Sequence, residues 1–147
     1  MRRLLLAAGA AVSMAVPLSA AGLATSAGAA VTPPTCAKLA GTIATSITVS
    51  KCSPTNAQYV SGSAPTSKVA SGSGTLTWSP SKRTTTIKVT FKQSGTACPA
   101  GSTEYVAAGT VTGGTATYTA KGQAVSVKVC ASSTGSLSLV PGTKAKL

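Results

Sequence analysis

Hydrophobic and polar residues alternate in short runs along the chain, with a period of two residues. The run TTTIKVTFK, residues 84–92, shows this most clearly, because Ile87, Val89 and Phe91 alternate with threonines and with Lys88 and Lys92. Successive side chains of a β-strand point to opposite faces, so the run predicts a strand that buries its three apolar residues and exposes its lysines. No stretch shows sustained apolar spacing of about 3.6 residues, and the pattern therefore favours an all-β fold.

Further alternating runs, separated by Gly, Pro and Ser, predict the other strands. We expect one unbroken strand over residues 41–50 and a weak strand near residues 58–61. Three hairpins are expected at residues 74–79 with 84–91, 103–112 with 115–121, and 124–130 with 136–140. Leu76 and Trp78 fall on the buried side of the first hairpin, and the pair Gly113-Gly114 suits the turn of the second. About seven short antiparallel strands predict a small β-sandwich or barrel, stabilised by disulfides.

The first thirty residues have the composition of a secretory signal peptide. A basic start at residues 1–3 precedes the uncharged run LLLAAGAAVSMAV, and a sequence of small residues ends at Ala29. These are the three parts of such a peptide. We predict that residues 1–29 are removed by cleavage after Ala29 or Ala30, which leaves residues 30–147 as a single β domain of ordinary size.

Removal of this peptide predicts a protein that is secreted, free or associated with the cell surface, with no transmembrane segment in the mature chain. An uncleaved membrane anchor is the alternative, because residues 4–35 carry no charge. Their Ala, Gly, Ser and Pro content makes a poor spanning helix, which favours cleavage.

Four cysteines in an exported chain, Cys36, Cys52, Cys98 and Cys130, predict two disulfides. An unbroken strand over residues 41–50 excludes the pair Cys36–Cys52, because it spans about 30 Å and a disulfide tolerates roughly 7 Å between α-carbons. Two strands between Cys98 and Cys130 would place these cysteines at opposite ends of the sheet. The predicted pairs are Cys36–Cys98 and Cys52–Cys130 if the segment after Cys52 supplies one strand, and the partners exchange if it supplies none.

The mature chain is strongly basic, with eleven lysine and arginine residues against the single acid Glu104. An exported protein of this charge meets anionic envelope polymers, acidic glycans, anionic lipid and nucleic acid. Lysine also protects strand edges from pairing with other chains and keeps a protein soluble. The charge by itself leaves both explanations open.

The candidate ligand surface consists of Lys82, Arg83, Lys88 and Lys92. By strand rise, Lys88 and Lys92 lie about 13 Å apart on one face, and Lys82 and Arg83 extend the positive charge at the hairpin turn. We predict that this surface binds anionic envelope polymers or glycans. The alternative is that it is only the solvent face of the strand, since Thr and Lys suit that role. A dedicated nucleic-acid site is not expected, because no aromatic residue lies among these side chains to stack on bases.

The sequence lacks the residues of common catalytic and metal sites. It has no histidine, and with one acidic residue it has no carboxylate pair and almost no anionic ligand for calcium. The cysteines lack the close spacing of zinc sites. We therefore predict no enzymatic activity, no metal and no cofactor, and we expect Glu104 to be a surface charge with a lysine neighbour.

Two alternative functions rest on local resemblances. The loop Cys98-Pro99-Ala100-Gly101 resembles the reactive-site pattern of subtilisin inhibitors of soil bacteria, which implies a secreted proteinase inhibitor.

The size, the Ala, Thr, Ser and Gly content and the expected disulfides resemble the chromoprotein apoproteins related to neocarzinostatin. Those proteins are β-sandwiches with a ligand cleft, so this resemblance implies a small-molecule carrier. Trp78, Tyr105 and Tyr118 would be its aromatic lining, and packing in the core is the other role open to them.

Overall fold

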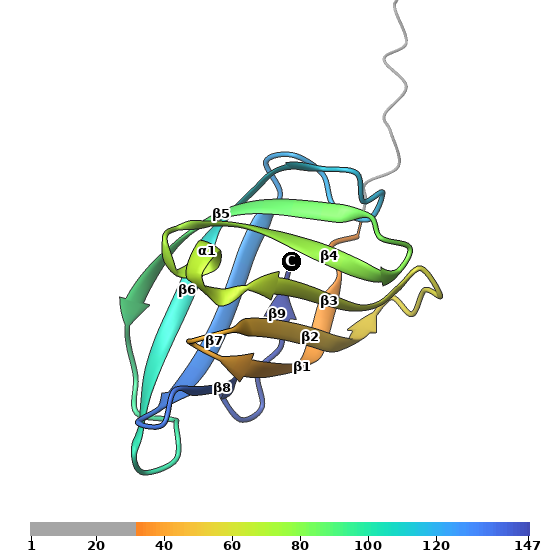
Figure 1. Ribbon diagram of the computed structural model, residues 1–147. Helices are drawn as coiled ribbons and strands as arrows, with labels where there is room; N and C mark the ends of the chain where they lie inside the picture. Colours follow the sequence, from red (N-terminus) through yellow and green to blue (C-terminus); the bar gives the residue numbers. More distant parts are fainter. Residues whose placement is uncertain (1–31) are drawn as a thin grey trace, which may run out of the picture.

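The alternating runs form nine strands and one short helix in residues 32–147, the part of the chain that the computed structural model describes (Figure 1). The predicted signal peptide and its cleavage site lie outside these residues. The elements are β1 (Thr35–Thr42), β2 (Ser46–Ser53), β3 (Tyr59–Pro65), α1 (Thr66–Ala70), β4 (Ser73–Pro80), β5 (Thr84–Gln93), β6 (Ser102–Gly114), β7 (Ala124–Ser132), β8 (Ser136–Leu139) and β9 (Ala145–Lys146). Within the described residues, no helix has the length and apolar character needed to cross a membrane.

The strands close into an antiparallel barrel. Each of β1 to β8 pairs with the next along the chain, and β8 pairs with β1, so eight strands complete the ring. The two-residue strand β9 pairs with both β1 and β7. The prediction of an all-β, disulfide-stabilised fold is confirmed, and of the two architectures expected it is the barrel that forms. Closure leaves no free edge in the ring of β1 to β8, which weakens edge protection as a reason for the lysines.

The two ends of the barrel differ. We call one end the mouth; it is formed by the β1–β2 turn (residues 43–45), α1, the β5–β6 loop (residues 94–101) and the β7–β8 turn (residues 133–135). The opposite, closed end carries the β2–β3, β4–β5 and β6–β7 connections. The C-terminal residue Leu147 lies in the barrel interior, where Figure 1 marks the chain end and where its side chain is buried.

The predicted strand over residues 41–50 is wrong, because the chain reverses at Ile43–Thr45. The Thr42 hydroxyl accepts a hydrogen bond from the Thr45 backbone N–H at 3.2 Å, which closes this turn. Gly41 lies so close to the Ser46 carbonyl that a Cβ atom there would collide with it. The turn therefore places β1 directly against β2.

The predicted strand over residues 115–121 is also wrong. Strand β6 continues to Gly114, and residues 115–123 form a loop that lies across the closed end. The side chains of this loop bond to other strands: the hydroxyl of Thr117 to that of Tyr59 at 3.0 Å, and the Tyr118 hydroxyl to the Asn56 amide at 2.8 Å. One strand, not two, therefore separates the 94–101 loop from β7.

Both disulfide pairs that we predicted are wrong, and both errors follow from these two segments. The structure joins Cys36 to Cys52 and Cys98 to Cys130. The β1–β2 turn sets Cys36 opposite Cys52 in register. With only β6 between them, Cys98 and the end of β7 both lie at the mouth, so Cys130 is within reach.

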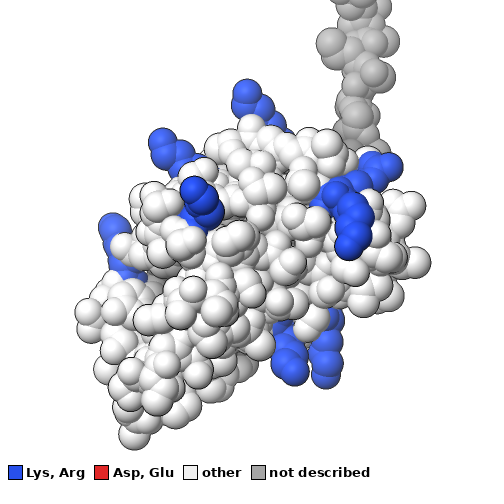
Figure 2. All heavy atoms as spheres, in the orientation of Figure 1, with Lys and Arg blue, Asp and Glu red and all other residues white. Residues whose placement is uncertain are grey.

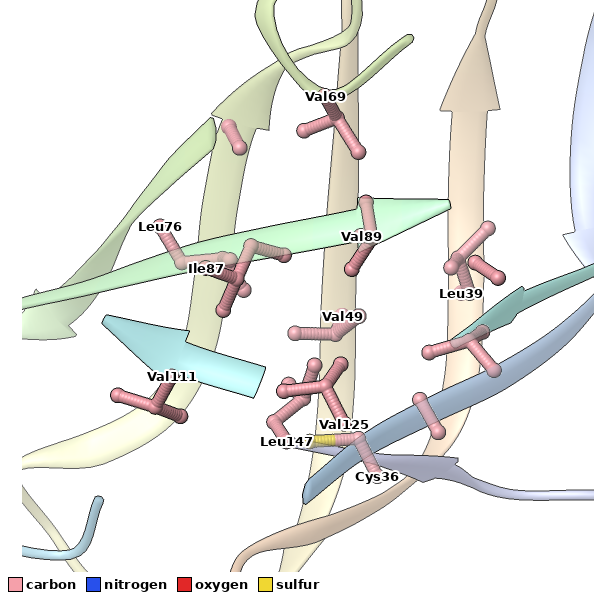
Figure 3. Packing of buried hydrophobic residues seen from close by; sticks show 14 of the residues in the cluster. Cys36, Leu39, Val49, Val69, Leu76, Ile87, Val89, Val111, Val125 and Leu147 are labelled. Atoms are coloured by element: carbon pink, nitrogen blue, oxygen red, sulfur yellow. The ribbon is translucent and has the colours of Figure 1, made fainter. Parts of the chain in front are cut away.

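The β4–β5 hairpin is confirmed, with one exception at its end. Leu76, Trp78, Ile87 and Val89 are buried on the inner face of the barrel, where Figure 3 shows several of them converging with residues of other strands. Phe91, predicted to be buried, is 40% exposed. The last pair between β4 and β5 is Ser73 with Lys88, so β5 projects beyond β4 and nothing on that side covers Phe91.

Candidate functional site: the barrel cavity

The barrel interior contains a cavity of about 540 Å³ that opens at the mouth. Its wall is almost entirely carbon, and its middle level is built from small side chains such as Ala107 of β6 and Val125, Val127 and Val129 of β7. An eight-stranded barrel has an interior that side chains either fill or that holds one small ligand. With Val and Ala on so much of the wall, the side chains of this barrel leave room for a ligand.

The larger side chains gather at the closed end instead. Tyr59 packs edge-on against Trp78 with ring centroids 5.5 Å apart, and Tyr118 packs against Tyr59 at 5.0 Å. Gly62 lies in contact distance of the Trp78 ring, so its lack of a side chain lets the indole lie flat against β3. This aromatic cluster fills the closed half of the barrel.

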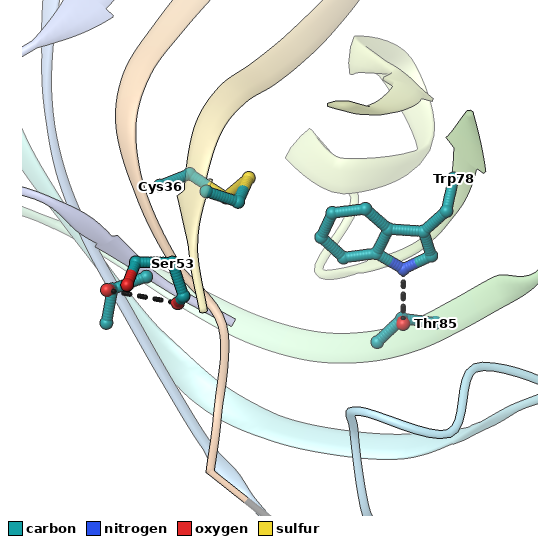
Figure 4. Close-up of a disulfide and its surroundings, with 6 residues drawn as sticks. Cys36, Ser53, Trp78 and Thr85 are labelled. Atoms are coloured by element: carbon teal, nitrogen blue, oxygen red, sulfur yellow. Dashed lines mark hydrogen bonds between the residues drawn. A yellow bond between two sulfur atoms is a disulfide. The ribbon is translucent and has the colours of Figure 1, made fainter. Parts of the chain in front are cut away.

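Hydrogen bonds fix the aromatic cluster in place. The Trp78 indole N–H donates to the Thr85 hydroxyl at 2.8 Å, the bond drawn in Figure 4, and the hydroxyl of Thr119 lies 3.0 Å from that of Thr85. Burial opposes ionisation of the Tyr59 phenol, yet hydrogen bonds with Thr117 and the charge of Arg83 outweigh it, so its pKa lies below its ordinary value. Every buried side-chain nitrogen and oxygen in residues 32–147 has a hydrogen-bond partner. The closed end is therefore a completed, rigid floor to the cavity.

The mouth, by contrast, exposes hydrophobic side chains. Ile43 in the β1–β2 turn is 58% exposed and Phe91 at the end of β5 is 40% exposed, and both line the cavity. Helix α1 forms part of the rim through Thr66, Val69 and Ala70. The Thr66 hydroxyl donates to the Thr42 carbonyl at 2.7 Å, which ties the helix to the β1–β2 turn. The mouth thus continues the apolar wall of the cavity out to solvent.

The three aromatic residues expected to line a carrier's cleft are divided between the two ends. Tyr105 lies on the cavity wall near the mouth, whereas Trp78 and Tyr118 belong to the aromatic cluster and do not line the cavity. The barrel also differs from the sandwich that the chromoprotein resemblance implies. The sequence analysis missed Ile43 and the valines of β7; the signal was a shortage of large side chains for eight inward faces.

The four basic residues of the predicted ligand surface do not form one cluster. Lys88 and Lys92 are exposed on the outer face of β5 as predicted, and the neighbouring Thr75 and Thr86 hydroxyls lie 3.1 Å apart. Lys82 and Arg83 lie at the closed end, about 26 Å along β5 from Lys92 by strand rise. Arg83 is half-buried and donates to the Thr115 carbonyl at 3.4 Å.

The basic side chains are spread over the surface. Figure 2 shows them dispersed over the face in view, with no acidic residue among them. The ten lysines of the described residues are all exposed.

Glu104 is not the surface charge that we expected. It is only 5% exposed and is covered by the β5–β6 loop, from which the Ala97 backbone N–H donates to a carboxylate oxygen at 3.0 Å. Strand pairing places Glu104 opposite Cys130. The carboxylate and the Cys98–Cys130 disulfide together hold this loop against the barrel wall.

The loop of the inhibitor resemblance is a tight turn. The Ser102 backbone N–H donates to the Pro99 carbonyl at 3.1 Å, and Gly101 has a positive φ of 80°. Gly101 also lines the cavity. A proteinase binds an extended segment, so this geometry does not favour the inhibitor prediction.

Comparisons with protein-family models, with curated proteins and with solved structures found no match. The functional argument therefore rests on the geometry of the cavity and its mouth. Within residues 32–147, no three His, Cys, Asp or Glu residues lie close enough together to hold a metal ion.

Proposed function

We propose that the protein is a non-catalytic, secreted binding protein that holds one small apolar molecule inside the barrel. The observation that carries this proposal is the open, carbon-lined cavity of about 540 Å³, whose rim presents Ile43 and Phe91 to solvent. Cavities of about 300 to 1,000 Å³ with mostly apolar walls are the usual size and character of small-molecule sites.

The chemistry of the wall defines the ligand class. Transfer of apolar surface from water into such a site is favourable by roughly 25 cal/mol for each Å² buried. The wall offers hydroxyls only near the mouth, from Thr103, Tyr105 and Ser133 among others, and no charged side chain. An uncharged hydrocarbon or aromatic molecule fits this environment, whereas an ion would lose its hydration without gaining a partner.

Titration with an uncharged fluorescent probe, N-phenyl-1-naphthylamine, tests the proposal. We expect a saturable rise in emission with one probe per chain and little dependence on salt, because burial of apolar surface drives the binding. A lack of saturable binding, in protein stripped of copurified ligand by organic extraction, would contradict the proposal.

The basic surface supports a second candidate function, the binding of anionic envelope polymers or glycans. Ten lysines are exposed while the chain's single acidic side chain, Glu104, is buried, so no acidic side chain offsets the surface charge. The closed barrel also removes one competing reason for these lysines, the protection of free strand edges.

Replacing two of these lysines tests the second candidate. We expect Lys88→Ser with Lys92→Ser to weaken binding to isolated cell-envelope material by about 5- to 30-fold at low salt, if each exposed charge pair is worth up to about 1 kcal/mol. Binding of the unchanged protein should fall steeply across a salt series. Lys121→Ser with Lys144→Ser removes the same charge elsewhere, and an equal loss in that control would mean that net charge, not the β5 face, is responsible.

A further inference from the structure

The mouth concentrates exposed hydrophobic residues. The described residues contain three large hydrophobic side chains that are exposed, and two of them, Ile43 at 58% and Phe91 at 40%, lie on the mouth. They come from different parts of the barrel, the β1–β2 turn and the end of β5. The third, Val60 at 59%, is on β3 and does not line the cavity.

Positive charge accompanies these residues at the mouth. Lys92 follows Phe91 on β5, and Lys68 is on α1 at the rim; both are exposed. The nearest acidic group, Glu104, is buried and bonded to the Ala97 backbone N–H beneath the β5–β6 loop. The mouth therefore presents apolar tips beside cations, with no exposed acidic side chain to repel an anionic surface.

We propose that the mouth docks onto an anionic lipid bilayer. Ile43 and Phe91 enter the apolar part of the interface, while Lys68 and Lys92 lie at the level of the lipid phosphates. Apolar side chains and flanking cations together are the combination that binds proteins to the surface of anionic membranes. Docked in this way, the cavity opens toward the bilayer, where apolar molecules dissolve.

Cosedimentation with lipid vesicles tests the docking. The purified protein is mixed with vesicles of phosphatidylcholine alone or with a third of phosphatidylglycerol, and bound protein is measured across a salt series. We expect binding to the anionic vesicles, at least a tenfold loss for Ile43→Ser with Phe91→Ser, and roughly a fivefold loss for each of Lys68→Ser and Lys92→Ser.

Matched controls keep the test specific to the mouth. Val60→Ser removes an equally exposed hydrophobic residue away from the mouth, and Lys121→Ser with Lys144→Ser removes the same charge as the two mouth lysines. Both controls should bind vesicles like the unchanged protein. All variants share the same N-terminal residues, so these cannot produce a difference among them.

Three results would overturn the docking proposal: equal binding by mouth and control variants, equal losses in both sets, or no binding to anionic vesicles. A dimer in light scattering that Ile43→Ser with Phe91→Ser makes monomeric would assign the mouth to self-association instead. Titration of the same samples with N-phenyl-1-naphthylamine in the absence of vesicles reports on the cavity separately. Probe binding without vesicle binding would therefore reject the docking alone.

Discussion

Replacing Val127 with phenylalanine is expected to abolish binding of the naphthylamine probe while the barrel stays folded. Val127 lies in the middle of β7, opposite Ala107 of β6, and both side chains line the cavity. A phenyl ring at this position extends into the space that the ligand would occupy. We expect at least a tenfold loss of probe affinity and a change in unfolding free energy of less than about 1 kcal/mol, because the added atoms enter a cavity rather than a packed core.

A matched substitution in the packed half of the barrel separates these effects. Val111 is also an inward-facing valine, but it is fully buried and does not line the cavity. Val111→Phe should destabilise the protein by about 1 to 3 kcal/mol or more, as overpacking does. Urea unfolding followed by the emission of Trp78, the only tryptophan, measures both variants. Equal destabilisation by the two substitutions would mean that the middle of the barrel is packed and that the proposed site is not there.

The local alternation of the sequence was sufficient to predict the β4–β5 hairpin and its faces. Leu76, Ile87 and Val89 point inward and Lys88 outward, because a period of two fixes the face of each residue once the strand is known. Phe91 shows the limit of that pattern. It keeps the inward side and lines the cavity, but its burial depends on whether neighbouring strands extend as far as β5 does.

Turns without a glycine or proline signal caused the main errors. The residues that reverse the chain between β1 and β2 are Ile43, Ala44 and Thr45, which read as a continuation of a strand. Conversely, Thr115 to Lys121 have high strand propensity but form the loop across the closed end, because their hydroxyls bond to Tyr59, Asn56 and Thr85. Those partners are more than thirty residues away along the chain. No local pattern could have identified them.

The cavity was beyond sequence reasoning for a different reason. A count of small and large side chains could suggest loose packing, but whether the interior is empty depends on the number of strands that close the ring. The clustering of Trp78, Tyr59 and Tyr118 at one end depends on register between strands that are distant in sequence. Only the assembled barrel shows that the aromatic residues fill the closed half and leave the other half to valine and alanine.

The disulfides are expected to carry a large part of the stability. In the chain-entropy model, the Cys36–Cys52 pair, with a sequence separation of 16, contributes about 3 kcal/mol, and the Cys98–Cys130 pair, with a separation of 32, about 3.5 kcal/mol. We expect paired alanine substitutions to lower the unfolding free energy by these amounts. Domains of this size are stable by only about 5 to 15 kcal/mol. The variant without any cysteine should therefore be largely unfolded near body temperature.

The same experiment tests the closure of the barrel. Each disulfide ties strand segments that the register places side by side, one pair at the closed end and the other at the mouth. Tryptic peptides from unreduced protein should therefore appear as the linked pairs Cys36–Cys52 and Cys98–Cys130 by mass spectrometry. A Cys36–Cys98 link would require a different strand order and would remove the basis for the cavity. Loss of the Cys98–Cys130 pair should also weaken probe binding, because this disulfide holds the loop that brings Gly101 to the cavity wall.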